Sequence, residues 1–374
     1  MSESLWSTKS RQGHHLHQMC PYQGSFPPQL PAYFLDRLPG KVVLDPFAGR
    51  GTVILEAVLR GRTAYGGDIS PVARALSQVK LHCAKQADVL EEIRSLDLTG
   101  DAPYPPPEIE PFFHPETWTQ VYCLKHTEKS PTLTALALGR LHGHSSGFFS
   151  GFTFNVISVS GKSLKKAQEK HGTSPEPRDV RILLEKAAMH FIPPGGIQGE
   201  GNIYAGDARH IPLPDASVDV VVTSPPFLDV IDYIDVNWLR LWFLGEKDPP
   251  ATFIRDEGEY KLFLKGCLQE LSRVLAPEGT IVFEVGPVKR NTRLDDVVCE
   301  AAEGVLRVED RVTNFFSGED VPKISRAMTG GEKTTTMENN CVVLKHEGSG
   351  RLPEGWADRA EVPPESPSLE DFFG

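Results

Sequence analysis

Two short runs of this sequence combine residue types that can do chemistry with turns that would expose them. "LDPFAGRGT" places Asp45 after a hydrophobic stretch and puts Gly49 and Gly51 in a turn before a helical pattern. "VDVVVTSPPF" places Ser224 after a valine-rich stretch, and two prolines then end any strand because proline has no N–H to donate. Ligands of doubly wound sheets bind at the carboxyl ends of strands, so both runs are candidates for one ligand edge.

The first run favours a ligand that carries an amine. Its glycines let a ligand approach the backbone closely. Asp68 in "GGDIS" lies 23 positions after Asp45, a spacing that suits a carboxylate bound to a ribose diol. The turn lacks the third glycine of the dinucleotide fingerprint, which disfavours NAD. An acid beside the ligand suits a cationic group such as the amino group of S-adenosylmethionine (AdoMet). The alternative is a tight turn that only caps a helix.

Together these motifs resemble those of the AdoMet-dependent DNA amino-methyltransferases, the N4-cytosine and N6-adenine enzymes. In that family, Asp-Pro-Phe-x-Gly-x-Gly-Thr holds the methionine part of the cofactor, and the acid after the second strand holds the ribose. "FPPQL" resembles the segment before the cofactor motif, and "GDAR" resembles the third-strand segment whose acid contacts the adenine amine. The cofactor-binding residues that the resemblance implies are Phe26, Asp45, Pro46, Phe47, Gly49, Gly51, Thr52, Asp68, Ile69, Asp207 and Ala208.

The second run resembles the catalytic motif of the same family, and the implied residues are Ser224, Pro225, Pro226 and Phe227. The implied reaction is methyl transfer to the exocyclic NH2 of a base, whose lone pair is delocalised into the ring. Ser224 Oγ and the Pro225 carbonyl would accept the hydrogen bonds of that amine, and the proline pair would hold the carbonyl rigidly. Phe227 would stack on a base flipped out of the duplex. The alternative is a strand end without chemistry.

A first-position serine is typical of the N4-cytosine enzymes, whereas Asp-Pro-Pro-Tyr is typical of the N6-adenine enzymes. The resemblance therefore implies a site-specific DNA methyltransferase that acts on cytosine N4 by direct transfer. Here the cofactor motif precedes the catalytic motif, whereas many N4-cytosine enzymes have the reverse order. An N6-adenine DNA enzyme, an RNA guanine-N2 methyltransferase and a non-catalytic nucleic-acid-binding subunit of this fold remain as alternatives.

The elements that must position these residues follow an α/β rhythm. Hydrophobic periodicity predicts a strand at 42–44, a helix at 52–60 and a strand at 64–67, a β-α-β unit that requires a parallel sheet. Further strands are predicted at 202–205 and 218–223, and a closing strand pair near the end. The resemblance implies a Rossmann-like class I AdoMet-dependent methyltransferase sheet, mostly parallel with a C-terminal antiparallel strand.

Four regions are expected along the chain. From residue 116 to about 141 the pattern is helical, and residues 101–198 are expected to form a mainly helical insert. The expected regions are the N-terminal segment with the cofactor-binding half at 1–100, the insert and DNA-recognition subdomain at 101–198, the catalytic half at 199–346, and an acidic, proline-rich, disordered tail at 347–374.

The net charge of the chain is compatible with DNA as a partner. The net charge is −11, but the tail contains seven acids and two arginines, so the remainder carries −6 and can still present a basic face to double-stranded DNA. If residues 162–170 are helical, Lys162, Lys166 and Lys170 share one face, with Lys165 beside them, and could bind phosphates. A solvated helix face is the alternative. A cognate restriction nuclease is a possible partner; the oligomeric state is not specified.

The chain has no apolar run of the ~20 residues that a membrane span needs, and its N-terminus has no signal-peptide pattern. Cytoplasmic residence is the expectation. The six cysteines are scattered without a Cys-x-x-Cys pair, which favours reduced thiols. His14, His15 and His17 with Cys20 lack regular ligand spacing, so no metal is expected.

Overall fold

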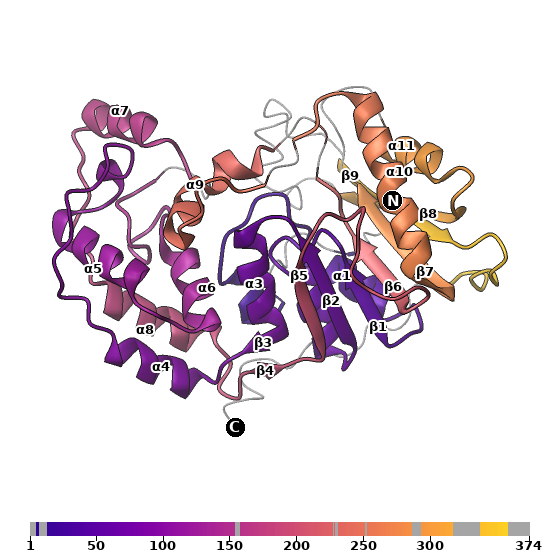
Figure 1. The fold of residues 1–374 in the computed structure, drawn as a ribbon, viewed down its shortest axis with the longest axis horizontal. Coiled ribbons are helices and arrows are strands. Elements are labelled where there is room, and N and C mark those ends of the chain that lie inside the picture. Colours follow the sequence, from indigo (N-terminus) through magenta and orange to yellow (C-terminus); the bar gives the residue numbers. More distant parts are fainter. Residues whose placement is uncertain are drawn as a thin grey trace.

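The computed structural model describes residues 5–6, 13–153, 158–226, 228, 231–250, 253–285, 293–316 and 337–357. Within these residues the chain forms a seven-stranded sheet in the order β5-β2-β1-β6-β7-β9-β8 (Figure 1). In that order the strands are Gly201–Ala205, Thr63–Asp68, Val42–Asp45, Val218–Thr223, Leu275–Val285, Met337–Lys345 and Arg307–Phe316. A two-stranded sheet pairs β3 (His82–Cys83) with β4 (Ile197–Gln198).

The strands from β5 to β7 are parallel, and β9 is antiparallel to both of its neighbours, β7 and β8. The order reverses between β1 and β6, because the chain leaves β1 toward β2 and β5 and later returns to β6 on the other side. The predicted α/β sheet, mostly parallel with a C-terminal antiparallel strand, is confirmed. Its switch point between β1 and β6 is where such sheets bind ligands.

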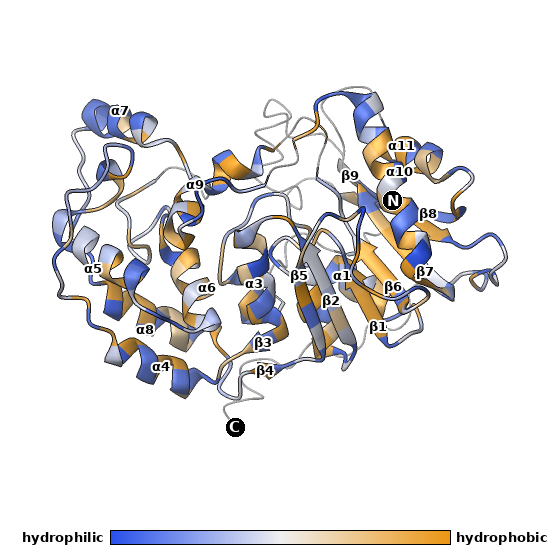
Figure 2. Ribbon diagram, in the orientation of Figure 1, coloured by the Kyte–Doolittle hydropathy of each residue, from blue (hydrophilic) through white to orange (hydrophobic). Residues whose placement is uncertain are grey.

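The central strands are hydrophobic on both faces because helices cover both (Figure 2). Alternate residues of each strand point to opposite layers. The set that packs with α1 and α2 includes Val43, Val220, Val222 and Val282. The set that packs with α10 and α11 includes Leu44, Val221, Ile281 and Phe283.

The helices lie on the two faces of the sheet and in a lobe beside it (Figure 1). Their bounds are η1 His15–Gln18, α1 Gln29–Leu35, α2 Thr52–Leu59, α3 Pro71–Leu81, α4 Gln86–Ser95, η2 Glu110–Phe112, α5 Pro115–His126, α6 Pro131–Arg140, α7 Gly161–His171, α8 Val180–Phe191, α9 Tyr233–Leu244, α10 Glu257–Val274 and α11 Leu294–Ala302. No helix of the described residues is long and apolar enough to cross a membrane.

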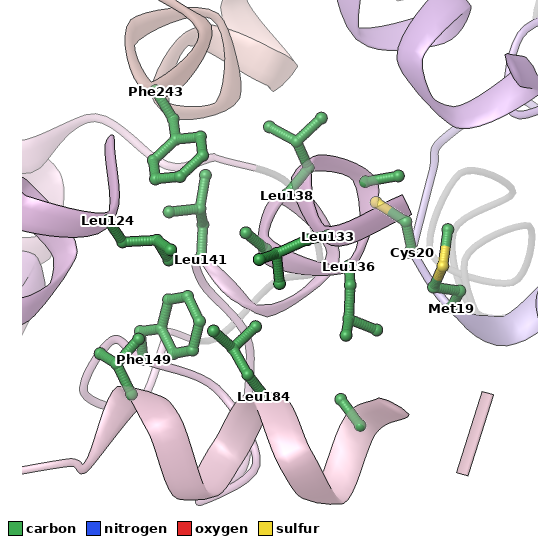
Figure 3. Close-up of a cluster of buried hydrophobic side chains, with 14 of the residues drawn as sticks. Met19, Cys20, Leu124, Leu133, Leu136, Leu138, Leu141, Phe149, Leu184 and Phe243 are labelled. Atoms are coloured by element: carbon green, nitrogen blue, oxygen red, sulfur yellow. The ribbon is translucent and has the colours of Figure 1, made fainter. Parts of the chain in front are cut away.

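The helical lobe has its own hydrophobic core (Figure 3), to which α5, α6 and α8 contribute Leu124, Leu136 and Leu184. Helices α4 and α9, which lie outside the predicted insert of 101–198, share this core, because Ile93 and Phe243 belong to the same cluster. The core therefore draws on chain from both sides of the insert, and the predicted boundaries of the insert stay a prediction.

The predicted helical region from 116 to about 141 consists of two helices, α5 and α6, separated by a short loop. Proline fixes φ and lacks an N–H, so Pro131 is favourable at the first turn of a helix and unfavourable in its interior. The Ser130 hydroxyl accepts the Leu133 N–H and caps the start of α6.

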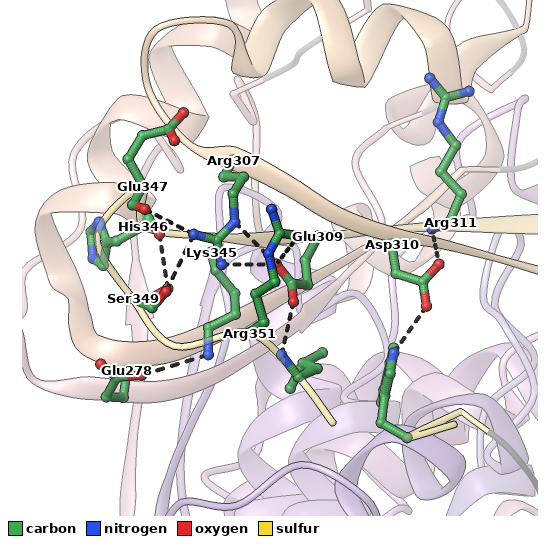
Figure 4. A network of polar contacts seen from close by, with 12 residues as sticks. Glu278, Arg307, Glu309, Asp310, Arg311, Lys345, His346, Glu347, Ser349 and Arg351 are labelled. Carbon is green, nitrogen blue, oxygen red and sulfur yellow. Dashed lines mark hydrogen bonds and ion pairs between the residues drawn. The ribbon is translucent and has the colours of Figure 1, made fainter. Parts of the chain in front are cut away.

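The first part of the predicted disordered tail is packed against the sheet (Figure 4). Arg307 in β8 donates to two carbonyl oxygens of the segment 347–357 at 2.8 and 3.3 Å. Trp356 Nε1 donates to Asp310 Oδ2 at 2.9 Å. This segment therefore belongs to the folded body, which corrects the predicted boundary. Residues 358–374 lie outside the described residues.

Candidate active site

Asp45 lies at the switch point of the sheet, where β1 ends beside β6. Its side chain is buried, and Oδ1 accepts hydrogen bonds from Thr223 Oγ1 at 2.6 Å and from the Phe47 N–H at 3.1 Å. Thr223 is the last residue of β6, so one carboxyl group joins the ends of the two predicted motif strands.

Asp68 ends β2 and joins that strand to the glycine-containing turn. Its Oδ2 accepts the Gly49 N–H at 2.9 Å, and its Oδ1 accepts the Ser70 N–H at 2.8 Å. Gly49 has a φ of +51°, a conformation that favours glycine and aims this N–H at the carboxyl group. The hydrogen bond from Gly49 to Asp68 therefore fixes the position of the glycine-containing turn relative to the end of β2.

Gly51 has a packing role in addition to the cofactor role that the resemblance implies, which stays a prediction. It lies at the N-terminus of α2 with a φ of +76°, and a Cβ there would lie 2.8 Å from Ser77 Cα of α3. Gly51 does not line the cavity described below. Its lack of a side chain allows α2 and α3 to approach each other closely.

Burial of Asp45 and Asp68 opposes the ionisation of both carboxyl groups. Burial raises the pKa of Asp45 to about 7, against the lowering effect of its hydrogen bonds to Thr223 and Phe47. Burial likewise raises the pKa of Asp68 to about 6. Asp68 also raises the pKa of Asp45, because two nearby carboxylates repel each other. A cationic ligand between them would relieve both effects.

Asp207 follows β5 and is paired with Arg209. Arg209 Nη2 lies 2.6 Å from Asp207 Oδ2, and Arg209 Nε donates to Oδ1 at 3.0 Å. This pairing holds the pKa of Asp207 below its usual value. The Arg209 guanidinium also lies over the Phe263 ring, 5.4 Å from its centroid. A ligand amine that binds Asp207 must therefore share this carboxylate with Arg209.

One cavity collects most of the predicted residues. It encloses about 1100 Å³, its open mouth included. Its predicted lining residues are Phe26, Asp45, Pro46, Phe47, Gly49, Thr52, Asp68, Ile69, Asp207, Ala208, Ser224 and Pro226. Pro225 is buried beside them and is not part of the lining. Phe227 lies outside the described residues, and its stacking role stays a prediction.

Two tyrosines that the sequence did not suggest as cofactor contacts also line the cavity. The rings of Tyr22 and Tyr233 are stacked with centroids 6.2 Å apart. Burial raises the pKa of Tyr22 well above its usual value. The two rings form an apolar wall beside Asp68. No local motif marks Tyr22, because its position depends on the path of the N-terminal segment.

A second group of residues supports the turn from behind. Arg50 Nη1 donates to the His17 carbonyl at 3.0 Å, and Lys80 donates to the Arg50 carbonyl. His17 Nε2 lies 2.8 Å from Glu56 Oε1, and burial lowers the pKa of His17 well below its usual value. The "HHLHQ" segment therefore packs against the predicted cofactor turn. None of its three histidines lines the cavity.

At the end of β6, Ser224 follows Thr223, whose partner in the β6–β7 register is Phe283, so the next residue of β7 is a buried acid, Glu284. Glu284 Oε1 accepts a hydrogen bond from Asn339 Nδ2 of β9 at 2.5 Å. Burial raises the pKa of Glu284. The sequence analysis missed Glu284. The available signal was an acid inside the hydrophobic run "TIVFEV", where the strand pattern alone predicts an apolar residue.

The four predicted DNA-binding lysines lie on α7, which confirms that the segment is helical. Lys162, Lys166 and Lys170 are exposed and, within the described residues, have no ion-pair partner. Lys165 is 3.5 Å from Glu110. In Figure 1, α7 lies at the upper end of the helical lobe. The carboxyl end of β2 also lies on the upper side of the sheet in Figure 1. The helix α3 follows β2, starts on that side and runs down to β3.

No protein-family model matches the chain. Over 79 residues the chain is 42% identical to the Type II methyltransferase M.MjaII of Methanocaldococcus jannaschii. The matched stretch is 21% of this chain and spans 15% of the length of that relative.

Two solved structures are similar over most of the chain. TrmN from Thermus thermophilus has a TM-score of 0.37 and 14% identity, over 90% of this chain and 53% of that one. The rRNA methyltransferase aviRa from Streptomyces viridochromogenes has a TM-score of 0.34 and 16% identity, over 90% of this chain and 91% of that one. Because both TM-scores lie below 0.5, neither likeness bears on the function.

Proposed function

We propose that the chain is an AdoMet-dependent DNA methyltransferase that modifies an exocyclic base amine, with cytosine N4 as its target. One observation carries the proposal: the acids of the cofactor motifs and the serine of the catalytic motif line the same cavity. The 42% identity over 79 residues to a Type II methyltransferase supports the methyl-transfer part. The resemblance of "TSPPF" to the catalytic motif supports the amine as acceptor.

The chemistry of the cavity fits AdoMet, which brings an ammonium group, a sulfonium, a ribose diol and an adenine amine. The buried acids Asp45 and Asp68 have raised pKa values, so a cationic ligand stabilises their ionised forms. We assign the methionine part to Asp45 with the backbone of the turn, the ribose to Asp68 and the adenine amine to Asp207. The aromatic rings of Tyr22 and Tyr233 exclude water from one side.

In the proposed reaction, the bound cofactor supplies an electrophilic methyl group. The protein holds the target amine through hydrogen bonds to Ser224 Oγ and to the carbonyl of Pro225. Accepting both N–H groups localises the nitrogen lone pair and directs it toward the methyl group. These acceptors are preorganised because Pro225 and Pro226 restrict the backbone that carries them. No covalent bond to the protein is needed.

The direct test incubates plasmid DNA with labelled AdoMet and the full chain, then identifies the modified nucleoside after digestion. We expect N4-methylcytosine. N6-methyladenine as the sole product would refute the cytosine assignment and favour the adenine alternative, which the cofactor-first motif order supports. Label in RNA and not in DNA would favour the guanine-N2 alternative. Calorimetry without AdoMet binding would leave only the non-catalytic binding subunit.

The role of Ser224 is tested by Ser224→Ala. We expect a loss of about 100-fold in kcat, as for the removal of one preorganised polar group from an active site. AdoMet affinity should stay within about twofold, because the cofactor acids are untouched. Ser217→Ala is the matched control, since Ser217 immediately precedes β6 and its hydroxyl donates to the Pro214 carbonyl, away from the cavity lining. Full activity of Ser224→Ala would contradict the assignment.

A further inference from the structure

The short helix α1 is contacted by aromatic side chains from both ends of the described chain. Near the N-terminus, the centroid of the Trp6 ring lies 5.2 Å from that of Tyr33 and 5.8 Å from that of Phe34. Near the C-terminus, the centroid of the Trp356 ring lies 6.2 Å from that of Phe34. The Tyr33 hydroxyl donates to the Ala357 carbonyl. Because a helix of seven residues is marginal alone in water, the position of α1 depends on such contacts.

Hydrogen bonds to β8 hold the C-terminal segment that carries Trp356 (Figure 4). Trp356 Nε1 donates to Asp310 Oδ2 at 2.9 Å. The Leu352 N–H donates to Glu309 Oε1 at 2.8 Å, and the side chain of Glu309 is buried. The segment 347–357 therefore connects β8, at the edge of the sheet, with α1, which lies near the start of the chain.

A rigid link connects α1 to the cofactor cavity. Phe26, which lines the cavity, is followed by Pro27 and Pro28, both of them buried. The carbonyl oxygens of these two prolines accept N–H groups of α1 at 3.1 Å each, so both prolines belong to the first turn of the helix. Because proline fixes φ, a displacement of α1 also displaces Phe26. Phe26 and Trp356 pack against the same hydrophobic cluster, which includes the buried residues of α1.

Resting on the proposed function, we propose that Trp356 is a positioning residue for the cofactor: it holds α1, and through α1 it holds Phe26 against the bound AdoMet. Trp356 does not line the cavity, so its effect on the cofactor is indirect. A contact that holds the cofactor equally before and during the reaction changes affinity and not the rate of the chemical step. Loss of the Trp356 ring should therefore weaken AdoMet binding and leave kcat at saturating AdoMet unchanged.

The first test is Trp356→Ala in the full chain, with AdoMet binding measured by calorimetry. We expect the affinity to fall about tenfold, which is within the range of coupling between residues of one packed cluster. Trp356→Phe keeps an aromatic ring beside Phe34 and should restore most of the affinity. Arg307→Gln is the matched control, because it removes the bonds from Arg307 to the Glu347 and Ser349 carbonyls, at the other end of the same segment. Its AdoMet affinity should stay within about twofold of the wild-type value.

A double-mutant cycle tests whether Trp356 acts through Phe26. Phe26→Ala should weaken AdoMet binding, and the double variant should bind no more weakly than Phe26→Ala alone, because the ring that Trp356 positions is already absent. Trp356→Leu, which keeps part of the apolar contact, takes the place of the alanine variant in the cycle if the latter does not fold. Additive losses of binding free energy, or wild-type affinity of the Trp356 variant, would overturn the inference. A wild-type chain that does not bind AdoMet would overturn the proposed function instead.

Discussion

At the scale of single residues, the buried acid Asp45, which would bind the ligand, lowers the stability of the folded chain. The pKa of Asp45 rises from 3.8 to about 7, and one pKa unit corresponds to about 1.4 kcal/mol. The folded chain therefore binds a proton at Asp45 more tightly than the unfolded chain does. The stabilisation that this tighter proton binding gives the folded chain is complete below pH 3.8 and is lost as the pH rises to about 7. Above that pH the ionised, buried Asp45 costs about 4 kcal/mol.

Asp45→Asn removes this cost while its amide oxygen keeps the bonds from Thr223 and Phe47. In urea unfolding at pH 8, we expect the variant to be more stable than the wild type by about 2–4 kcal/mol. The gain should disappear near pH 4. AdoMet affinity should fall at least tenfold at pH 8 and lose its decline toward pH 6. A stability difference that is the same at both pH values would contradict the burial of a titrating Asp45.

At the scale of elements, α2 is bounded by two glycines that make a matched pair. Gly51 precedes the helix with a φ of +76°, and Gly61 follows it with a φ of +65°. A Cβ at Gly51 would lie 2.8 Å from Ser77 Cα, whereas a Cβ at Gly61 would meet nothing within 4 Å. At both positions the left-handed backbone would strain any other residue, but only at Gly51 would a Cβ also meet a neighbouring helix.

Gly61→Ala should therefore cost about 1 kcal/mol, from the left-handed backbone alone. Gly51→Ala should cost about 2–4 kcal/mol, because α2 and α3 must also separate. Denaturant unfolding of the two variants measures the difference. Separation of the helices would also shift the turn that holds Asp68, so AdoMet affinity should fall only for Gly51→Ala. Equal stability of the two variants would contradict the close contact of α2 and α3.

The local elements around the cofactor motif could be predicted because their signals are short-range. The β1-α2-β2 unit follows from hydrophobic periodicity and glycine placement between Val42 and Asp68. Two features of the structure do not follow from the local pattern: a second helix begins at Pro131 within one helical pattern, and Trp356 packs on the sheet through a tertiary contact. The Ser224–Glu284 pair depends on the register of β6 with β7, with all of α9 and α10 between them. No local pattern specifies that register.

At the scale of the whole molecule, the helical lobe and the sheet present the predicted DNA contacts and the cavity on the same side. The α7 helix lies at the upper end of the lobe in Figure 1, the side on which β2 ends. Its lysines are exposed, although the chain as a whole carries a net charge of −11. DNA held by α7 would place a flipped base near the strand ends, which is the geometry the proposed function requires.

Replacement of Lys162, Lys166 and Lys170 by alanine should weaken DNA binding and leave AdoMet affinity unchanged. Each lost phosphate contact reduces the slope of log K against log salt by about 0.9, so we expect a reduction of about 2–3. Alanine at three exposed lysines elsewhere, Lys85, Lys186 and Lys265, is the charge-matched control. Equal salt slopes for the two triple variants would contradict the assignment of α7 as the DNA contact.

The position of β9 has a consequence for the protein during its synthesis. Asn339, which holds Glu284, lies on β9, and β9 is inserted between β7 and β8 although it follows both in the chain. A nascent chain that has emerged only as far as β8 has every acid of the proposed cofactor site but lacks Asn339. Under the proposed function, ribosome-bound chains arrested before Met337 should fail to methylate DNA, because the end of β7 beside the predicted catalytic motif lacks its pairing partner until β9 has joined the sheet.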